Sequence, residues 1–208
     1  LRMLKDPRAS ASLVDQFAMQ WLQLKRLELI APDAKLFSDF NDALRRAMLT
    51  ETRLFLDTLL REDRSLLELI AADFTFLNEP LARHYGIADT NGNLVGKHPE
   101  RDTGQPIRGG DFVRVNLTNT GRGGLLTQAS VLTVTSNPTR TSPVKRGRWV
   151  LEQLLGTPPP PPPPNVPELE QGEKLTGSLR QRLEQHRANP SCANCHARMD
   201  PLGFAFEN

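Results

Sequence analysis

Long apolar runs are missing from this 208-residue sequence, and no stretch approaches the roughly 18 consecutive apolar residues that a membrane-spanning helix requires. The opening residues also lack the apolar core of a secretory signal peptide. The chain has no large excess of positive or negative charge, because its 26 Lys and Arg residues nearly balance its 24 Asp and Glu residues. The sequence therefore predicts no membrane span in this chain, and its charge argues against nucleic acid as a partner.

Cysteine and aromatic residues are scarce. The two cysteines, Cys192 and Cys195, are too few and too close together to form a disulfide scaffold for a small secreted fold. Aromatic residues make up only 6% of the chain, which disfavours a surface row of aromatic anchors for a partner. A Ser-His-Asp order, an HExxH zinc motif and a phosphate-binding glycine loop are absent as well. We therefore expect the cysteine pair to serve a local chemical purpose.

What is present is the composition of a globular protein, with 38% hydrophobic and 24% charged residues. Apolar residues recur at helical spacing over about 12–31 and again over about 38–60. A capping box at 65–68 predicts a short helix, and another is expected at 81–85, where Gly86 provides a left-handed stop. The pattern predicts a helical bundle domain over residues 1–87.

A loop-rich connection is expected over residues 88–122, where Gly, Asn, Asp, Pro and Thr are frequent. Residues 112–117 alternate as in a short strand, but the segment is too isolated to predict a sheet. Residues 125–134 contain Thr and Val, so the segment is compatible with either a helix or a strand, and we favour a helix. Ser142 and the proline that follows it are a clear helix start, and that helix is expected to stop at Gly156.

The segment before the cysteines contains seven consecutive prolines, residues 158–164. Such a run adopts polyproline II, rising about 3 Å per residue and so spanning about 20 Å. We favour a rigid strut over a ligand for a proline-recognition domain, because such ligands usually lie in disordered tails. A charged helix over 173–187 is then expected to lead to the cysteines.

The residues that carry chemistry are Cys192-Ala193-Asn194-Cys195-His196. This CxxCH pattern is typical of c-type haem attachment. On a helical turn, positions i, i+3 and i+4 lie on one face, so two thiols can each add to a haem vinyl group while the imidazole reaches the iron. The pattern predicts one covalently bound haem c, with His196 as the proximal iron ligand.

The sequence favours two other uses of the cysteine pair less strongly than haem attachment. A thioredoxin-like redox pair would require a preceding strand and a βαβ context, which the sequence lacks. A zinc site would require four ligands, and only His186 and the motif itself could supply them, without a second CxxC.

Further residues are candidates for contact with the haem. Met199 lies only three residues beyond His196, so we expect it to pack beside the haem rather than to reach the opposite face of the iron. The basic side chains of Arg146 and Arg148 could pair with haem propionates, although a solvated helix face is the favoured explanation for them. The distal ligand stays open. Either an open sixth site or a ligand from sequence beyond residue 208 is equally compatible with the pattern, and the candidates within the chain are Met3, Met19, Met48, His84, His98 and His186.

Several stretches of the sequence resemble the planctomycete-type, cytochrome-like family that is built of consecutive bacterial domains of unknown function and has a CxxCH haem c motif. The resemblance rests on residues 122–128, 141–147 and 154–157 with their prolines, and on 192–204; residues 62–65, 72–78 and 84–86 resemble the preceding domain. It implies a large exported bacterial protein in which other haem-binding modules precede this region, and hence a periplasmic or other extracytoplasmic location.

These observations predict a mainly α fold: a helical bundle, then a smaller helical cytochrome c-like module at 123–208 with irregular loops and a polyproline strut. The leading hypothesis is an electron-transfer module of a larger protein, exchanging electrons with a redox partner or with other haem domains of the same parent chain. One alternative is a haem oxidase or peroxidase domain with an open distal site, so that the module would form part of a haem-dependent oxidoreductase. Another is a helical interaction module in which the cysteine pair is structural.

Overall fold

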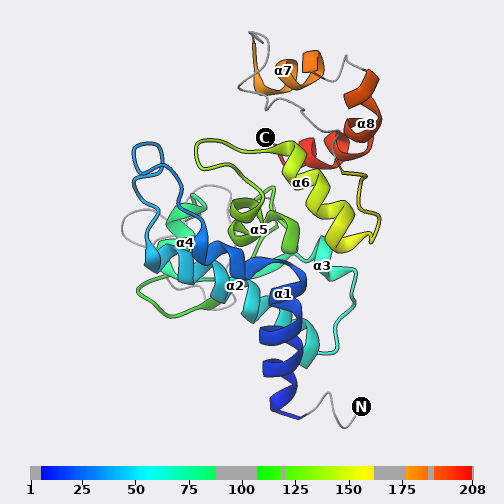
Figure 1. The fold of residues 1–208 in the computed structure, drawn as a ribbon. Coiled ribbons are helices and arrows are strands. Elements are labelled where there is room, and N and C mark those ends of the chain that lie inside the picture. Colours follow the sequence, from blue (N-terminus) through cyan, green and yellow to red (C-terminus); the bar gives the residue numbers. More distant parts are fainter. Residues whose placement is uncertain (1–5, 88–106, 119, 162–176, 187–189, 208) are drawn as a thin grey trace. The chain divides into compact units, whose positions relative to one another are not determined.

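The computed structural model describes residues 6–87, 107–118, 120–161, 177–186 and 190–207 (Figure 1). The chain divides into two compact units, residues 1–140 and residues 141–208, and each is described by itself. Both units are mainly helical, which confirms the predicted mainly α fold. Among the described residues, no helix combines the length and the apolar character that crossing a membrane requires.

The first unit consists of short helices around one long helix, together with two strands in its described part. In chain order the elements are η1 (Ser10–Ala18), α1 (Met19–Trp21), η2 (Leu24–Leu29), α2 (Asp42–Arg61), α3 (Glu68–Ala71), β1 (Phe74–Leu77), α4 (Glu79–His84), β2 (Val113–Asn116), η3 (Leu125–Thr127) and α5 (Ala129–Val134).

Helix α2 forms the centre of this unit. Its start is capped by Asn41, whose side chain accepts a hydrogen bond from the backbone N–H of Leu44 at 3.0 Å, and Asp42 in the first turn suits the helix dipole. Met48 and Phe55 are fully buried on its inner face. The long helix predicted at about 38–60 is confirmed, with its start moved to the first residue after the cap.

The predicted helix at about 12–31 is not continuous. Gln23 has a left-handed backbone with φ of 57°, which separates helices η1 and α1 from the 3₁₀-helix η2. Leu22 and Leu24 are both fully buried, and two positions two residues apart lie on opposite sides of a regular helix. The break at Gln23 therefore lets both leucines enter the core, which one straight helix would not allow.

A two-stranded antiparallel sheet joins β1 to β2, with Phe74 opposite Asn116 and Leu77 opposite Val113. The isolated strand suspected at 112–117 is therefore real, and its partner β1 was not foreseen. The phenyl ring of Phe74 lies 5.4 Å from that of Phe55 in α2, which attaches the sheet to the central helix. Strand β2 and helix α5 belong to the first compact unit, which ends at residue 140. The domain boundaries expected at 87/88 and 122/123 stay a prediction.

The second unit contains α6 (Pro143–Trp149), η4 (Val150–Leu154), α7 (Leu179–His186) and α8 (Pro190–Phe204). The predicted start at Ser142 is confirmed, because its hydroxyl accepts a hydrogen bond from the N–H of Lys145 at 3.4 Å. Gly156 follows the helical segment with a left-handed φ of 60°. Residues 158–161 have neither helix nor strand structure, and the rest of the predicted strut lies outside the described residues.

Helices α6 and α8 approach each other backbone to backbone, and they lie side by side in Figure 1. A Cβ atom on Gly147 would come within 1.9 Å of the carbonyl oxygen of Met199. A Cβ on Gly203 would come within 1.8 Å of the carbonyl oxygen of Pro143. Glycine is therefore required at both crossing points, and these two residues set the distance between the helices.

Candidate functional site

The predicted attachment motif lies within helix α8, the last helix of the second unit. Cys195 is a free, partly buried cysteine, and the side chain of His196 is only 14% exposed. Cys192 lies in the same helix three positions before Cys195, but its side chain lies outside the described residues. One continuous helix thus carries all three motif positions at spacings of i, i+3 and i+4, which share a face.

The same face of α8 also attaches the helix to the rest of the unit. Cys195, Met199 and Gly203 follow one another at intervals of four residues, so they form one stripe along the helix. Met199 is buried, and it is at Met199 and Gly203 that helix α6 crosses. The predicted role of Met199 beside a haem stays a prediction, while the structure gives it a packing role against Gly147.

The imidazole of His196 is held by a carboxylate that the sequence analysis did not single out. Nδ1 of His196 lies 2.9 Å from Oδ1 of Asp200, one helical turn further along α8. The side chain of Asp200 is fully buried. The signal that could have revealed this residue is its i+4 position relative to His196, because such positions are neighbours on a helix.

The two arginines predicted to contact haem propionates are both paired with carboxylates of the chain. Arg146 is buried, donates to Glu207 at 2.6 Å and donates to the carbonyl oxygen of Phe206 at 3.0 Å. Burial lowers the pKa of Arg146, and the negative charge of Glu207 opposes this effect. Arg148 is exposed and donates to Glu152 at 2.5 Å. Their predicted role toward propionates stays a prediction.

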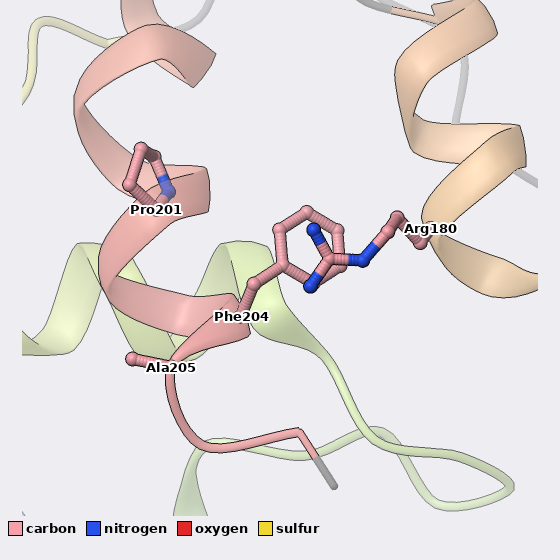
Figure 2. Close-up of a pocket in the computed structure, with 4 residues that line it drawn as sticks. All are labelled: Arg180, Pro201, Phe204 and Ala205. Carbon is pink, nitrogen blue, oxygen red and sulfur yellow. The ribbon is translucent and has the colours of Figure 1, made fainter.

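A pocket of about 380 Å³ opens between α7 and α8, and Figure 2 shows its lining residues: Arg180, Pro201, Phe204 and Ala205. The guanidinium of Arg180 lies 4.2 Å from the centre of the Phe204 ring. Pro201 is two positions beyond Met199, which places it about 200° around the helix axis. The pocket therefore lies on a different side of α8 from the stripe that carries Cys195.

Other possible metal ligands are dispersed in the part of the chain that the structure describes, where no group of three or more His, Cys, Asp or Glu side chains gathers around a common point. Met48, one candidate for the distal ligand, is fully buried in the first unit, where its sulfur lies 3.8 Å from the hydroxyl of Thr133. Met3, His98 and the side chain of His186 lie outside the described residues, so the zinc alternative that would use His186 is not tested either.

A second cluster of ionisable side chains lies inside the first unit, around Glu51 of α2. The Glu51 carboxyl is fully buried and accepts hydrogen bonds of 2.6 Å from the hydroxyls of Thr75 and Tyr85. Burial raises the pKa of Glu51 to about 7, although the two donors act in the opposite direction. The hydroxyl of Tyr85 also accepts from the N–H of Ala129 at 2.7 Å. These hydrogen bonds connect α2 and β1 with α5 and with Tyr85, the residue that follows α4.

Two family models match this chain. Residues 122–208 match PSCyt3, described as a protein of unknown function (DUF1588), and residues 1–87 match PSD4, described as a protein of unknown function (DUF1592). The two matches support the resemblance that the sequence shows to this family. Helix α8, with Cys195, His196 and Asp200, lies within the first of these ranges. No curated protein and no solved structure matches the chain.

The donor set on α8 is chemically suited to a haem of the c type. A cysteine thiol can form a thioether to the porphyrin, and a neutral imidazole is a common axial ligand of haem iron. Cys195 supplies the thiol, and the ring of His196 is fixed through Nδ1, so Nε2 is the nitrogen that would bind iron. Haem attachment needs only one imidazole from the helix, because the porphyrin supplies the equatorial ligands. A metal site built from protein alone would need about four ligating side chains.

Proposed function

We propose that the second unit is the attachment module for one covalently bound haem c and that it transfers electrons as part of a larger exported bacterial protein. The observation that carries this proposal is the placement of Cys192, Cys195 and His196 within one helix, α8, with the imidazole held by Asp200. A helix presents such positions on one face, which is the arrangement that double thioether formation and axial ligation require.

Each motif residue has a distinct role in this proposal. The thiols of Cys192 and Cys195 would hold the haem by adding across its two vinyl groups, and Nε2 of His196 would bind the iron. When bound, a haem supplies a one-electron couple between ferrous and ferric iron. Covalent attachment keeps that couple on helix α8, and the close crossing at Gly147 and Gly203 keeps the helix fixed within its unit.

The family matches also support the proposal, at the level of the whole domain rather than of individual residues. The name of the PSCyt3 family suggests a cytochrome-like domain, and the range that matches it includes the whole motif. Haem attachment to cysteines occurs where proteins are exported, so we propose a periplasmic or other extracytoplasmic location. The partner would be a redox protein or another haem domain of the same parent chain, because a bound haem in this module needs a donor and an acceptor of electrons.

The experiment that tests the proposal is a denaturing pyridine haemochrome spectrum combined with intact mass spectrometry. The chain would be exported from a bacterial strain competent for cytochrome c maturation. We expect one haem to stay on the denatured chain, and we expect the double change Cys192→Ser with Cys195→Ser to abolish this retention. Ala197→Ser is the matched control, because it places a new serine on the same helix at an exposed position and should leave haem retention intact.

A wild-type chain that stays free of haem under these conditions would overturn the proposal. It would leave the cysteine pair as a site for another metal or a disulfide. If haem is retained, the absorption spectrum distinguishes the two redox hypotheses. A low-spin, six-coordinate iron supports an electron carrier, whereas a high-spin iron that binds cyanide supports an oxidase or peroxidase.

A further inference from the structure

The contact between His196 and Asp200 differs from the ion pairs on the surface of the same unit. The His196 side chain is 14% exposed and that of Asp200 is 0% exposed, whereas Arg148 in the pair with Glu152 is 52% exposed. Exposed pairs contribute little, because water already solvates both charges. A carboxylate without exposure loses its hydration, and this loss requires compensation from its protein contacts.

The geometry of this contact also defines the chemistry of the ring. An ionised carboxylate has no proton to donate, so a hydrogen bond between Oδ1 of Asp200 and Nδ1 of His196 requires the proton to be on Nδ1. The neutral imidazole is then the tautomer whose Nε2 carries the lone pair that a metal can bind. The hydrogen bond also restricts rotation of the imidazole ring about the Cβ–Cγ bond of His196.

The two residues are held together by the helix that carries them. They are four positions apart in α8, so their side chains are neighbours whenever the helix is formed. The residue directly before Asp200, Met199, lies against Gly147, which fixes the helix at this turn. The contact is therefore prepared by the fold before any cofactor binds.

We propose that Asp200 is the positioning residue of the haem site, and that it sets the tautomer, the orientation and the donor strength of the His196 ligand. This inference rests on the haem attachment proposed above. A carboxylate bonded to the far nitrogen of a ligating histidine increases the basicity of the nitrogen that binds the metal. Asp200 accordingly stabilises the ferric iron relative to the ferrous iron and lowers the reduction potential.

The variant that tests this role is Asp200→Asn, which keeps the shape of the side chain and an oxygen acceptor but removes the negative charge. Ferric iron carries one more positive charge than ferrous iron, so loss of a nearby negative charge destabilises the ferric state. We expect an upward shift of the midpoint potential in a spectroelectrochemical titration of the haem-loaded chain. We expect the amount of covalent haem to stay unchanged, because the thioether bonds do not involve Asp200.

Glu184→Gln is the matched control. It removes another carboxylate of the second unit, from an exposed position on α7, and should leave the potential unchanged. If Asp200→Asn retains its haem and its potential equals that of the control, the positioning role is wrong and the proposed haem function stands. If the wild-type chain itself retains no haem, the proposed function fails, so the two failures are distinguishable.

A second measurement needs no variant and no haem. The full wild-type chain, labelled with ¹⁵N and produced without haem attachment, can be studied by long-range ¹H–¹⁵N correlation spectroscopy of its histidine rings. We expect neutral His196 to have its proton on Nδ1. A ring protonated on Nε2 would overturn the proposal even if the Asp200→Asn variant failed to fold.

Discussion

Glu51 is an ionisable residue that folding removes from water entirely. Its carboxyl accepts from Thr75 and Tyr85, and burial keeps a proton on it up to about pH 7, whereas its ordinary pKa is 4.5. Between these two pH values the folded chain binds more protons than the unfolded chain does. Because of this difference, the contribution of Glu51 to stability is complete below about pH 4.5 and is lost as the pH rises through about 7.

The substitution Glu51→Gln tests this account, since a glutamine in the same place cannot titrate. The pKa difference corresponds to about 3 kcal/mol, because each pKa unit is worth about 1.4 kcal/mol. We expect the free energy of unfolding of the variant to rise relative to that of the wild type by up to this amount between pH 4.5 and pH 7. Urea unfolding at a series of pH values measures the difference.

Glu28→Gln is the control for Glu51→Gln, because Glu28 is exposed. Its pH profile should follow that of the wild type. Parallel profiles for the wild type and the Glu51→Gln variant would contradict the buried-proton account.

The sequence predicted the motif residues Cys195 and His196 but revealed neither Asp200, which contacts His196, nor the buried Glu51 of the first unit. Cysteine and histidine at this spacing have few alternative uses, so a single chain is sufficient to identify them. Asp200 and Glu51 gain their roles from burial, which depends on how α8 and α2 pack, and an acidic residue on a helix is more often a solvent-exposed one. Buried carboxylates of this kind are recognised only from three-dimensional information.

At the scale of elements, the crossing of α6 and α8 depends on two glycines. Gly147 faces the backbone of Met199 and Gly203 faces the backbone of Pro143. In each case the obstacle to a larger side chain is a backbone carbonyl, which cannot move without displacing the whole helix. Substitution of these two glycines by any larger residue should therefore be tolerated much less well than substitution of glycines in open loops.

We expect Gly147→Ala to destabilise the second unit by about 1–3 kcal/mol or more, because the added methyl group would overlap the Met199 carbonyl. Thermal unfolding followed by circular dichroism gives the change. Gly110→Ala is the matched control, since no atom lies within 4 Å of the methyl group that it would add. Equal losses in the two variants would show that the helix crossing is looser than described.

The start of α2 gives a second prediction for an element. Replacing Asn41 by Ala removes the acceptor for the N–H of Leu44 and should cost about 1 kcal/mol of unfolding free energy. Asn41→Asp retains an acceptor at the same place and should restore most of this loss. Chemical denaturation of both variants measures the difference, and no loss in Asn41→Ala would indicate that another group satisfies this N–H.

Helices that have local signals could be predicted, and elements defined by distant partners could not. Ser142 marks the start of α6 because capping depends on residues three or four positions away, and the helical spacing over about 38–60 predicted α2 although not its cap. Strand β1 pairs with a segment about 40 residues later, and no local pattern records that pairing. The break at Gln23 similarly follows from the burial of two leucines against the rest of the unit rather than from a helix-breaking residue.

At the scale of the whole molecule, the chain consists of two units that each have buried side chains of their own. Phe55 is buried in the first unit, and Trp149 is buried in the second. A defect in one core should therefore affect that unit first. We expect Gly203→Ala to reduce amide hydrogen-exchange protection in α6 and α8 while α2 keeps its wild-type protection. Uniform loss of protection across both units would contradict two separate cores.

Glu207 binds two residues at the beginning of the second unit. Its carboxylate accepts from the hydroxyl of Thr141 at 2.7 Å and from the guanidinium of Arg146 at 2.6 Å. Thr141 and Glu207, the first and last described residues of this unit, therefore lie next to each other. A segment whose two ends touch can be grafted into a surface loop of a host protein without stretching either partner. Residues 141–207 thus have the geometry of a transplantable cassette.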